Sequence, residues 1–284
     1  MRKKLEELNL IDDFMFFKTL ENEDVGEEFA RRLLKIIFGR EFGKLKVIPQ
    51  RVYYGADTDK HGVRLDVYLE EEIDQNTLLE DATICDIEPE VLDKEKEKDS
   101  LPRRVRFYHS QIDSVIFEAG KSYKDLKKVI VVMIMPFDPF GYDQKIYTIM
   151  NKCLEVPELP YDDGAKTMFL YTRGRKGMIS EGLQELLKYM EETTDENVTN
   201  GDLKEIHNMV IRVKQNVGVS KEYMKWVEIQ EMWKENGLAE GLAEGQKLEF
   251  INTVKRMLKK GMTIREIANI YDKEVDEIEA IVHM

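Results

Sequence analysis

Four carboxylates lie close together in two short segments whose sequences are typical of β-strands. Asp66 stands in VRLDVYL, and Asp86, Glu88 and Glu90 stand in TICDIEPE. Because side chains alternate along a strand, the last three share one face. Carboxylates on neighbouring strands can converge on a divalent cation, while a further carboxylate orients or deprotonates a water molecule. The spacing predicts either a metal site for phosphodiester cleavage or a solvated acidic face of the sheet.

The charge of the chain is concentrated around these carboxylates. The net charge is −13, and the segment from Glu70 to Asp99 holds 13 acids and 3 lysines, a net charge of −10. The rest of the chain is therefore close to neutral. A concentrated acidic segment suits divalent metal binding, and it also suits an ordinary exposed loop. The acidic total argues against loose, charge-driven binding of nucleic acid, which depends on lysine and arginine.

Composition and motifs argue against several other classes of protein. The longest apolar run, VIVVMIM, is only strand-sized, and MRKKLEELNL lacks the apolar core of a secretory signal, so no membrane association is expected. Two cysteines, Cys85 and Cys153, make neither a disulfide framework nor a zinc motif, and a cytoplasmic location is the expectation. The sequence has no phosphate-binding glycine loop and no nucleophile elbow.

The order of the elements predicts a mixed α/β fold with helices packed on a sheet. One helix is expected over 12–38, with Gly26 as a break and Gly39 as its end. The apolar, β-branched run KKVIVVMIMPF is typical of a central strand that is covered on both faces. Further strands are expected at 46–54, 63–69, 83–90 and 166–172, and further helices over 101–119 and from Ser180 onward.

The helix that follows the acidic strands is rich in basic and amide side chains. It carries Arg103, Arg104, Arg106, His109 and Gln111. Groups of this kind beside an acidic metal site can hold a phosphate backbone. The alternative is that the arginines pair with the nearby acidic loop at the surface.

A glycine stripe marks the C-terminal part of the chain. In ENGLAEGLAEGQ, Gly237, Gly241 and Gly245 lie four residues apart and would line one side of a helix. Small residues at this spacing allow two helices to approach closely. Because glycine also weakens a helix, a flexible joint is the alternative.

The last segment predicts a small helical module. Thr263 and Glu266 form a capping box, and two short amphipathic helices divided near Asp272 are expected after it. This arrangement resembles a helix-turn-helix. The second helix carries four acids, which the phosphates of DNA would repel. A packing or self-association module is therefore favoured over a reader of DNA.

Several segments resemble, in order, those of the recombination-promoting nuclease and transposase family within the PD-(D/E)XK nucleases. They are DDFMFF, GVRLDVYLEE, TICDIEPE, LPRRVRFYHSQID, EAGKSYKDLKKVIVVMIMPFDPFG, GLAEGLAEGQ and GMTIREIA. The resemblance covers most of the chain and is most specific over residues 12–140. It implies a restriction-endonuclease-like mixed sheet flanked by helices, dependence on Mg²⁺ (or Mn²⁺), and cleavage of DNA.

The resemblance also implies roles for individual residues. Asp66 matches the first position of the nuclease motif and Glu88 the second, so both are expected to bind the metal. Glu90 departs from the third position, where Lys or Gln is usual, because a carboxylate cannot donate a hydrogen bond. It would act as a general base, or the site would bind metal and cleave poorly. Asp13 would reach the site from the first helix, or would simply favour the start of that helix.

The basic helix packs beside the active site in this superfamily. Arg104 is therefore expected to contact the phosphate backbone of DNA, and Gln111 is expected to support that contact. Together these inferences predict a magnesium-dependent DNA endonuclease linked to recombination or mobile elements. The alternatives are a nuclease-like fold that has lost cleavage and binds DNA or protein, and a structural protein that forms homo-oligomers through its C-terminal helices.

Three domains are expected. Residues 1–178 would form the nuclease-like domain, residues 179–235 a helical extension, and residues 236–284 the glycine-stripe helix with the small C-terminal module.

Overall fold

The computed structural model describes residues 3–53, 63–72, 83–90, 99–117 and 120–282. Within these ranges, the side chains of residues 49–53, 63–66, 239–248 and 281–282 are not described. The chain forms two compact units, Met1–Ser220 and Lys221–Met284. The domain boundaries predicted at residues 178 and 235 stay predictions. α5 (Glu181–Glu191) and α6 (Gly201–Lys214), which follow residue 178, pack on α1 and α2 within the first unit.

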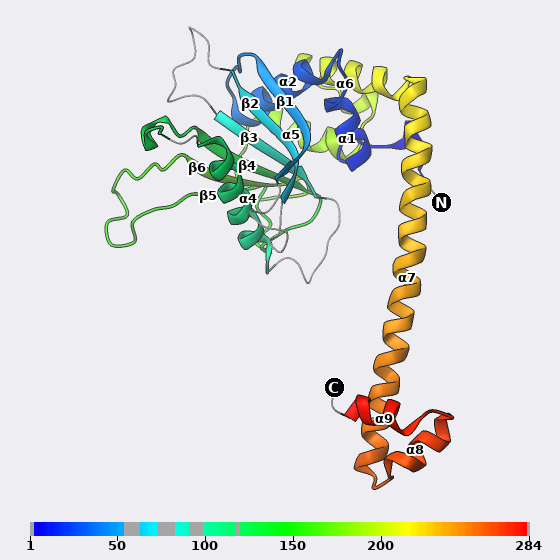
Figure 1. Ribbon diagram of the computed structural model, residues 1–284. Helices are drawn as coiled ribbons and strands as arrows, with labels where there is room; N and C mark the ends of the chain where they lie inside the picture. Colours follow the sequence, from blue (N-terminus) through cyan, green and yellow to red (C-terminus); the bar gives the residue numbers. More distant parts are fainter. Residues whose placement is uncertain (1–2, 54–62, 73–82, 91–98, 118–119, 283–284) are drawn as a thin grey trace. The chain divides into compact units, whose positions relative to one another are not determined.

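The first unit is built on one mixed sheet of six strands in the order β1-β2-β3-β4-β6-β5 (Figure 1). Neighbours are antiparallel from β1 to β3, parallel from β3 through β4 to β6, and antiparallel between β6 and β5. The predicted mixed α/β fold is therefore confirmed. The strands are β1 (Leu45–Tyr53), β2 (Val63–Glu71), β3 (Thr83–Pro89), β4 (Lys128–Met135), β5 (Ile146–Ile149) and β6 (Ala165–Tyr171).

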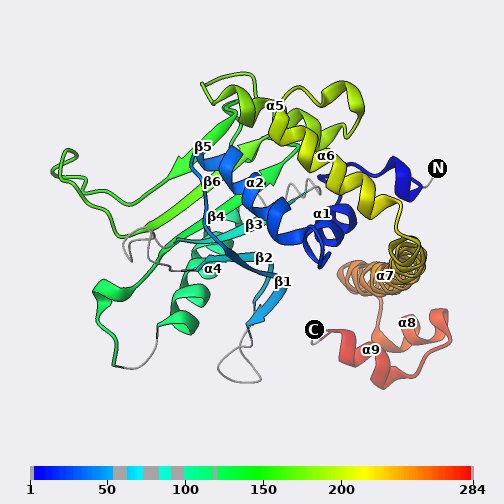
Figure 2. The same cartoon turned by 90° about the horizontal axis from the view of Figure 1, so that it is seen from above.

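Helices cover both faces of this sheet. Figure 2 shows α4 (Leu101–Ile116) on one side and α2 (Gly26–Phe38) with α5 on the other. The apolar face of α4, with Val105 and Ile112, packs on Tyr68, Ile84 and Met133. β3 is buried along its whole length, because β2 and β4 flank it and helices cover both faces of the sheet.

The helix expected over 12–38 is two helices, α1 (Asp13–Leu20) and α2. The chain turns so tightly between them that a Cβ on Gly26 would lie 2.2 Å from the carbonyl oxygen of Leu20. Only glycine fits this approach. Gly39, with φ +68°, ends α2 in the left-handed conformation, as predicted. Short 3₁₀ turns lie at Leu5–Glu7, Tyr123–Asp125 and Asp195–Asn197.

The second unit contains most of α7 (Val217–Lys259), followed by α8 (Ile264–Tyr271) and α9 (Val275–Val282). Val254, Ile267, Ala268 and Ile278 form its buried core. The predicted capping box is present, since the Thr263 hydroxyl accepts from the Glu266 N–H at 3.3 Å. Asp272 divides the two short helices in a left-handed conformation, also as predicted.

The backbone of α7 continues as helix through the glycine stripe. A Cβ on Gly237 would meet open space, and Gly241 and Gly245 belong to the part whose side chains are not described. Among the described residues, no helix is both long enough and apolar enough to cross a bilayer.

Candidate functional site

The carboxylates of β3 lie on the face of the sheet that α4 covers. Tyr68 pairs with Asp86 and Glu70 with Ile84 in the antiparallel register of β2 and β3. Asp86 is 0% exposed and Glu88 is 5% exposed. Continuing the register by two residues along each strand brings backbone positions 66 and 88 opposite each other. The side chain of Asp66 itself lies outside the described part of the chain.

Glu90 is the first residue after β3. Its N–H still donates to the carbonyl oxygen of Ile134 at 2.9 Å, so the end of β3 remains attached to β4 beyond Pro89. This attachment fixes where the Glu90 side chain emerges. Its carboxylate accepts a hydrogen bond from Nη2 of Arg104 at 2.9 Å. The side chains of this ion pair are 23% and 29% exposed, so the pair is partly shielded from water.

Arg104 connects α4 to the carboxylates. Burial by itself would lower the pKa of its guanidinium, but Tyr108, Glu90 and Glu88 raise the pKa above its ordinary value. The influence of Glu88 means that one arginine interacts with both acids of the predicted motif. Nε of Arg104 is buried and has no hydrogen-bond partner among the described residues.

Asp13 approaches the same place from α1, where it is the first helical residue. Surrounding protein atoms desolvate its carboxyl, and the charges of Glu90 and Asp12 add to this effect. Together they raise the pKa of Asp13 to about 6. The electrostatic interaction with Glu90 brings a residue from the opposite helix layer into the group formed by Glu88, Glu90 and Arg104.

The other polar residues of the basic helix are divided by their positions around it. Gln111 lies seven residues after Arg104, nearly two turns, so it shares the face of α4 that carries Arg104 and Tyr108. It is roughly 10 Å further along the helix. His109 faces β6 instead, where its Nε2 lies 3.0 Å from the hydroxyl of Thr167, and burial lowers the pKa of its imidazole.

Arg103 and Arg106 are exposed, and no ion pair joins either to a described carboxylate. The acidic segment 91–98, with which they could pair, lies outside the described residues. Within the described part, Arg104 is thus the arginine of this helix that meets the predicted acids.

Tyr108 was missing from the predicted site, and the structure brings it close enough to Arg104 to raise the pKa of the guanidinium. Tyr108 is one turn after Arg104 and is 8% exposed. Its helical spacing was the available signal. Among the described side chains, no three of His, Cys, Asp and Glu are grouped as a metal site requires, and Asp66 is not among them.

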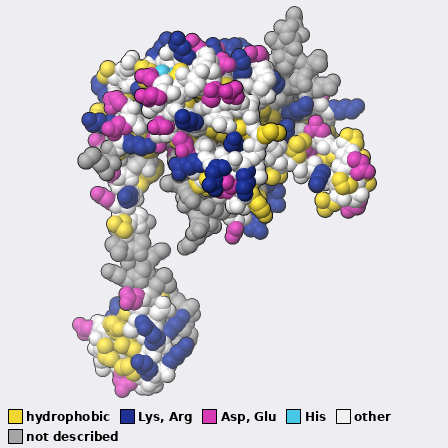
Figure 3. All heavy atoms as spheres, turned by 180° about the vertical axis from the view of Figure 1, so that it is seen from behind, with side chains coloured by type: hydrophobic (Ala, Val, Ile, Leu, Met, Phe, Trp, Pro, Cys, Tyr) yellow, Lys and Arg dark blue, Asp and Glu magenta, His cyan; other side chains and the backbone are white. Residues whose placement is uncertain are grey.

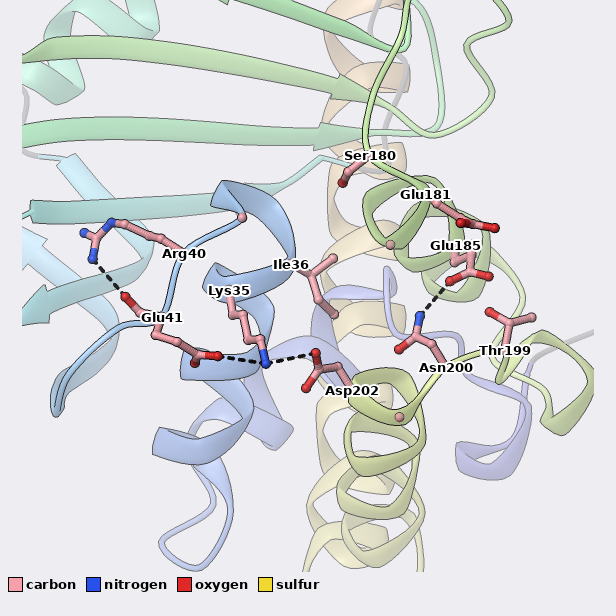
Figure 4. A pocket seen from close by; sticks show the side chains of 13 residues that line it. Lys35, Ile36, Arg40, Glu41, Ser180, Glu181, Glu185, Thr199, Asn200 and Asp202 are labelled. Atoms are coloured by element: carbon pink, nitrogen blue, oxygen red, sulfur yellow. Dashed lines mark hydrogen bonds and ion pairs between the residues drawn. The ribbon is translucent and has the colours of Figure 1, made fainter.

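A pocket lies elsewhere in the first unit, between α2, α5 and α6 (Figure 4). Its volume is about 780 Å³. Lys35, which lines it, is paired with Glu41 at 2.9 Å and with Asp202 at 3.3 Å. The amide of Asn200 donates to Glu185 at 2.6 Å. Because the polar groups of this pocket largely bind one another, it offers weaker grounds for a ligand than the end of β3.

No family model, no curated protein and no solved structure matches this chain. The evidence for a function of this protein is therefore the geometry at the end of β3 and the chemistry of the residues that lie there.

Proposed function

We propose that this protein is a divalent-metal-dependent DNA endonuclease. The observation that carries the proposal is the ion pair of Glu90 with Arg104 at the end of β3, with Glu88 and Asp13 close enough to interact electrostatically with its members. The strand register adds Asp66, whose backbone position is opposite Glu88 when the pairing is continued. In this proposal Asp66 and Glu88 hold Mg²⁺ (or Mn²⁺), Glu90 orients or activates water, and Arg104 contacts a phosphate.

The chemistry of the donors fits such a cation. Mg²⁺ and Mn²⁺ prefer carboxylate oxygens over nitrogen or sulfur. Glu88 and Asp86 are buried two residues apart on one face of β3, so this face presents carboxylate oxygens. A divalent cation bound there would lower the pKa of a water molecule and would neutralise charge on the phosphate.

Arg104 can provide the hydrogen-bond donor that Glu90 cannot. Related nucleases usually place Lys or Gln at the third motif position, and the resemblance implies that this residue donates to water or phosphate. Glu90 cannot donate, but Arg104 brings a guanidinium within 2.9 Å of it. We infer that Arg104 supplies the missing donor from α4.

We propose that the first unit has a restriction-endonuclease-like core, and the arrangement of its strands and helices supports this more specific fold. Antiparallel β1–β3 lead into parallel β4 and β6, and helices lie on both faces. The acids stand at the end of a central strand under α4. We also propose membership of the recombination-promoting nuclease family on the segments quoted above, with DNA as the partner.

A second candidate is a nuclease-fold protein that binds DNA or protein without cleaving. The ion pair of Glu90 with Arg104 favours it, because the pair occupies two groups that cleavage would need. Formation of homo-oligomers through the glycine stripe of α7 is compatible with either candidate, because the backbone there is helical.

Nicking of a supercoiled plasmid in Mg²⁺ or Mn²⁺ separates these candidates. Purified wild type is compared with Asp66→Ala, with Glu90→Gln, and with Glu72→Gln as an exposed acidic control. We expect wild type and Glu72→Gln to nick and Asp66→Ala to be inactive. Nicking by Glu90→Gln alone would identify a nuclease disabled at its third position. Inactivity of all four proteins would reject the endonuclease and favour the binding protein.

A further inference from the structure

A basic block stands at the junction of α7 and α8. Between Phe250 and Arg265 the chain has five basic residues and no acidic residue, although the protein as a whole has a net charge of −13. The block belongs to the second unit, away in sequence from every residue of the candidate site. The first acidic residue after this block is Glu266, and further acidic residues follow it toward the C-terminus.

Helical geometry gathers four of the basic residues on one side. Lys255 and Lys259 are four residues apart on α7. Arg256 and Lys260, the residue directly after α7, have the same spacing, and the Lys260 N–H donates to the Arg256 carbonyl oxygen at 3.2 Å. The four residues therefore form two adjacent rows. Val254, in the same turn, is 0% exposed and belongs to the core with α8 and α9. The basic rows therefore face outward while the apolar side of α7 is buried. In the lower unit of Figure 3, lysine and arginine side chains gather in one area.

The charges on this face are available to a partner. All four residues are exposed, and no ion pair joins them to a described carboxylate. Among the described residues, Arg256 donates hydrogen bonds within its own helix, to the Thr253 hydroxyl (3.0 Å) and the Asn252 carbonyl oxygen (3.4 Å). Those two polar residues border the basic rows and add hydrogen-bonding groups to the face.

The dipole of α7 explains only part of the block. Cations in the last turn of a helix are favoured by the partial negative charge there. That effect does not require Arg265, which lies beyond α7, and it does not explain why no acid occurs over the whole block. Like charges four residues apart repel each other, so an external anion would stabilise the rows.

We propose that Lys255, Arg256, Lys259 and Lys260 form a second DNA-contacting face, which binds phosphates without reading sequence. The inference rests on the proposed function, since DNA is its ligand. A membrane surface is less suitable, because a helix that lies on lipid needs a free apolar side and that side of α7 is buried. The acids of α9, including Asp276 and Glu277, still argue against base reading by that helix.

The test uses the full chain carrying Asp66→Ala, so that binding is measured without cleavage. A fluorescein-labelled 20-base-pair duplex is titrated in EDTA at several salt concentrations. Lys255→Gln/Lys259→Gln/Lys260→Gln is compared with Lys221→Gln/Lys225→Gln/Lys234→Gln. The control removes the same charge from exposed positions of the same helix. Circular dichroism checks that both variants keep their helices.

We expect the first variant to bind more weakly and its slope of log affinity against log salt to fall by up to about 2.7, or about 0.9 for each phosphate that the protein no longer neutralises. The control should keep the slope of the parent. Equal slopes for the two variants would overturn the proposal. So would binding of phosphatidylserine vesicles, abolished in the first variant, with no binding of the duplex.

The outcome is separable from that of the endonuclease proposal. If the wild type does not nick plasmid but binds the duplex through these lysines, the second DNA-contacting face stands and cleavage fails. If the wild type nicks plasmid and the two lysine variants bind equally, cleavage stands and the face is rejected.

Discussion

Glu90 and Arg104 form an ion pair at the end of β3, and Asp13 and Glu88 interact electrostatically with its members. Burial of a carboxyl beside other acids disfavours its ionised form. The pKa of Asp13 is raised mainly because its carboxyl is buried, and the charges of Glu90 and Asp12 add to this effect. A metal ion would favour the ionised form instead, since ligands must lose their protons.

The pH dependence of stability follows from Asp13. Its pKa is raised to about 6 in the folded chain, from 3.8. The folded state therefore holds this proton more tightly, and the resulting stability is present below about pH 4 and is lost as pH rises through 6. We expect Asp13→Asn to stabilise the metal-free protein at pH 7.5 by on the order of 1 kcal/mol, after allowance for solvent screening, and by about half as much at pH 5, where the carboxyl is already ionised in the unfolded chain.

Urea unfolding at the two pH values measures this difference. Glu23→Gln is the matched control, because Glu23 is an exposed acid in the turn before α2. It should change the free energy of unfolding by the same small amount at pH 5 and pH 7.5. A stabilisation by Asp13→Asn that is the same at pH 5 and pH 7.5 would show that Asp13 is not perturbed as described.

Arg104 gives a second prediction at this scale. If it supplies the donor that Glu90 lacks, Arg104→Gln should reduce nicking about 10²-fold, as loss of a transition-state donor does. Arg104→Lys should recover part of the rate, because it keeps a charge and a donor. Arg103→Gln changes an exposed arginine on the same helix and should have the wild-type rate. Equal rates for Arg104→Gln and Arg103→Gln would contradict the role.

Residue patterns in the sequence predicted some of this site and missed the rest. Alternation along TICDIEPE placed Asp86, Glu88 and Glu90 on one face, and the first two are buried beneath α4 on that face. The partnership of Glu90 with Arg104 could not be predicted, because it depends on how α4 lies across the sheet. The position of Asp13 depends likewise on how α1 packs.

Among the elements, the junction of α1 and α2 controls where Asp13 lies. A methyl group on Gly26 would overlap the backbone of Leu20, which a rotamer change cannot relieve. We expect Gly26→Ala to destabilise the protein by about 1–3 kcal/mol. Gly201→Ala, at the start of α6 with open space around it, should be neutral or stabilising by up to about 1 kcal/mol. Chemical denaturation measures both, and a neutral Gly26→Ala would show that the junction is not tight.

The elements were largely predictable where hydrophobic periodicity was long. β2, β3, β4 and β6 agree with the predicted strands to within a few residues, and α4 ends at Ile116, three residues before the predicted end. β5 was missed, since four residues give too short a pattern for a strand. The helical segment expected over 12–38 is divided at the predicted break, since α2 begins at Gly26, but the close approach of Gly26 to Leu20 could not be predicted from the sequence.

At the scale of the whole molecule, two units with separate cores should unfold separately. Ile112 belongs to the core under α4, and Ile267 belongs to the core of the second unit. Both are 0% exposed, and truncation of either to alanine should cost about 2–5 kcal/mol within its own unit. Hydrogen exchange followed by mass spectrometry should show faster exchange in the first unit for Ile112→Ala and in the second for Ile267→Ala. Faster exchange of both units in either variant would mean one cooperative structure.

The central claim, that the end of β3 forms a divalent-metal site, is tested most directly by calorimetric titration of Mn²⁺ into the protein without DNA. Wild type, Glu88→Gln and Glu72→Gln are compared at pH 7.5. We predict one Mn²⁺ per chain for wild type and Glu72→Gln, and affinity at least tenfold weaker for Glu88→Gln, a loss of about 1.4 kcal/mol or more. Absence of Mn²⁺ binding by wild type, or equal affinity in Glu88→Gln, would contradict the account.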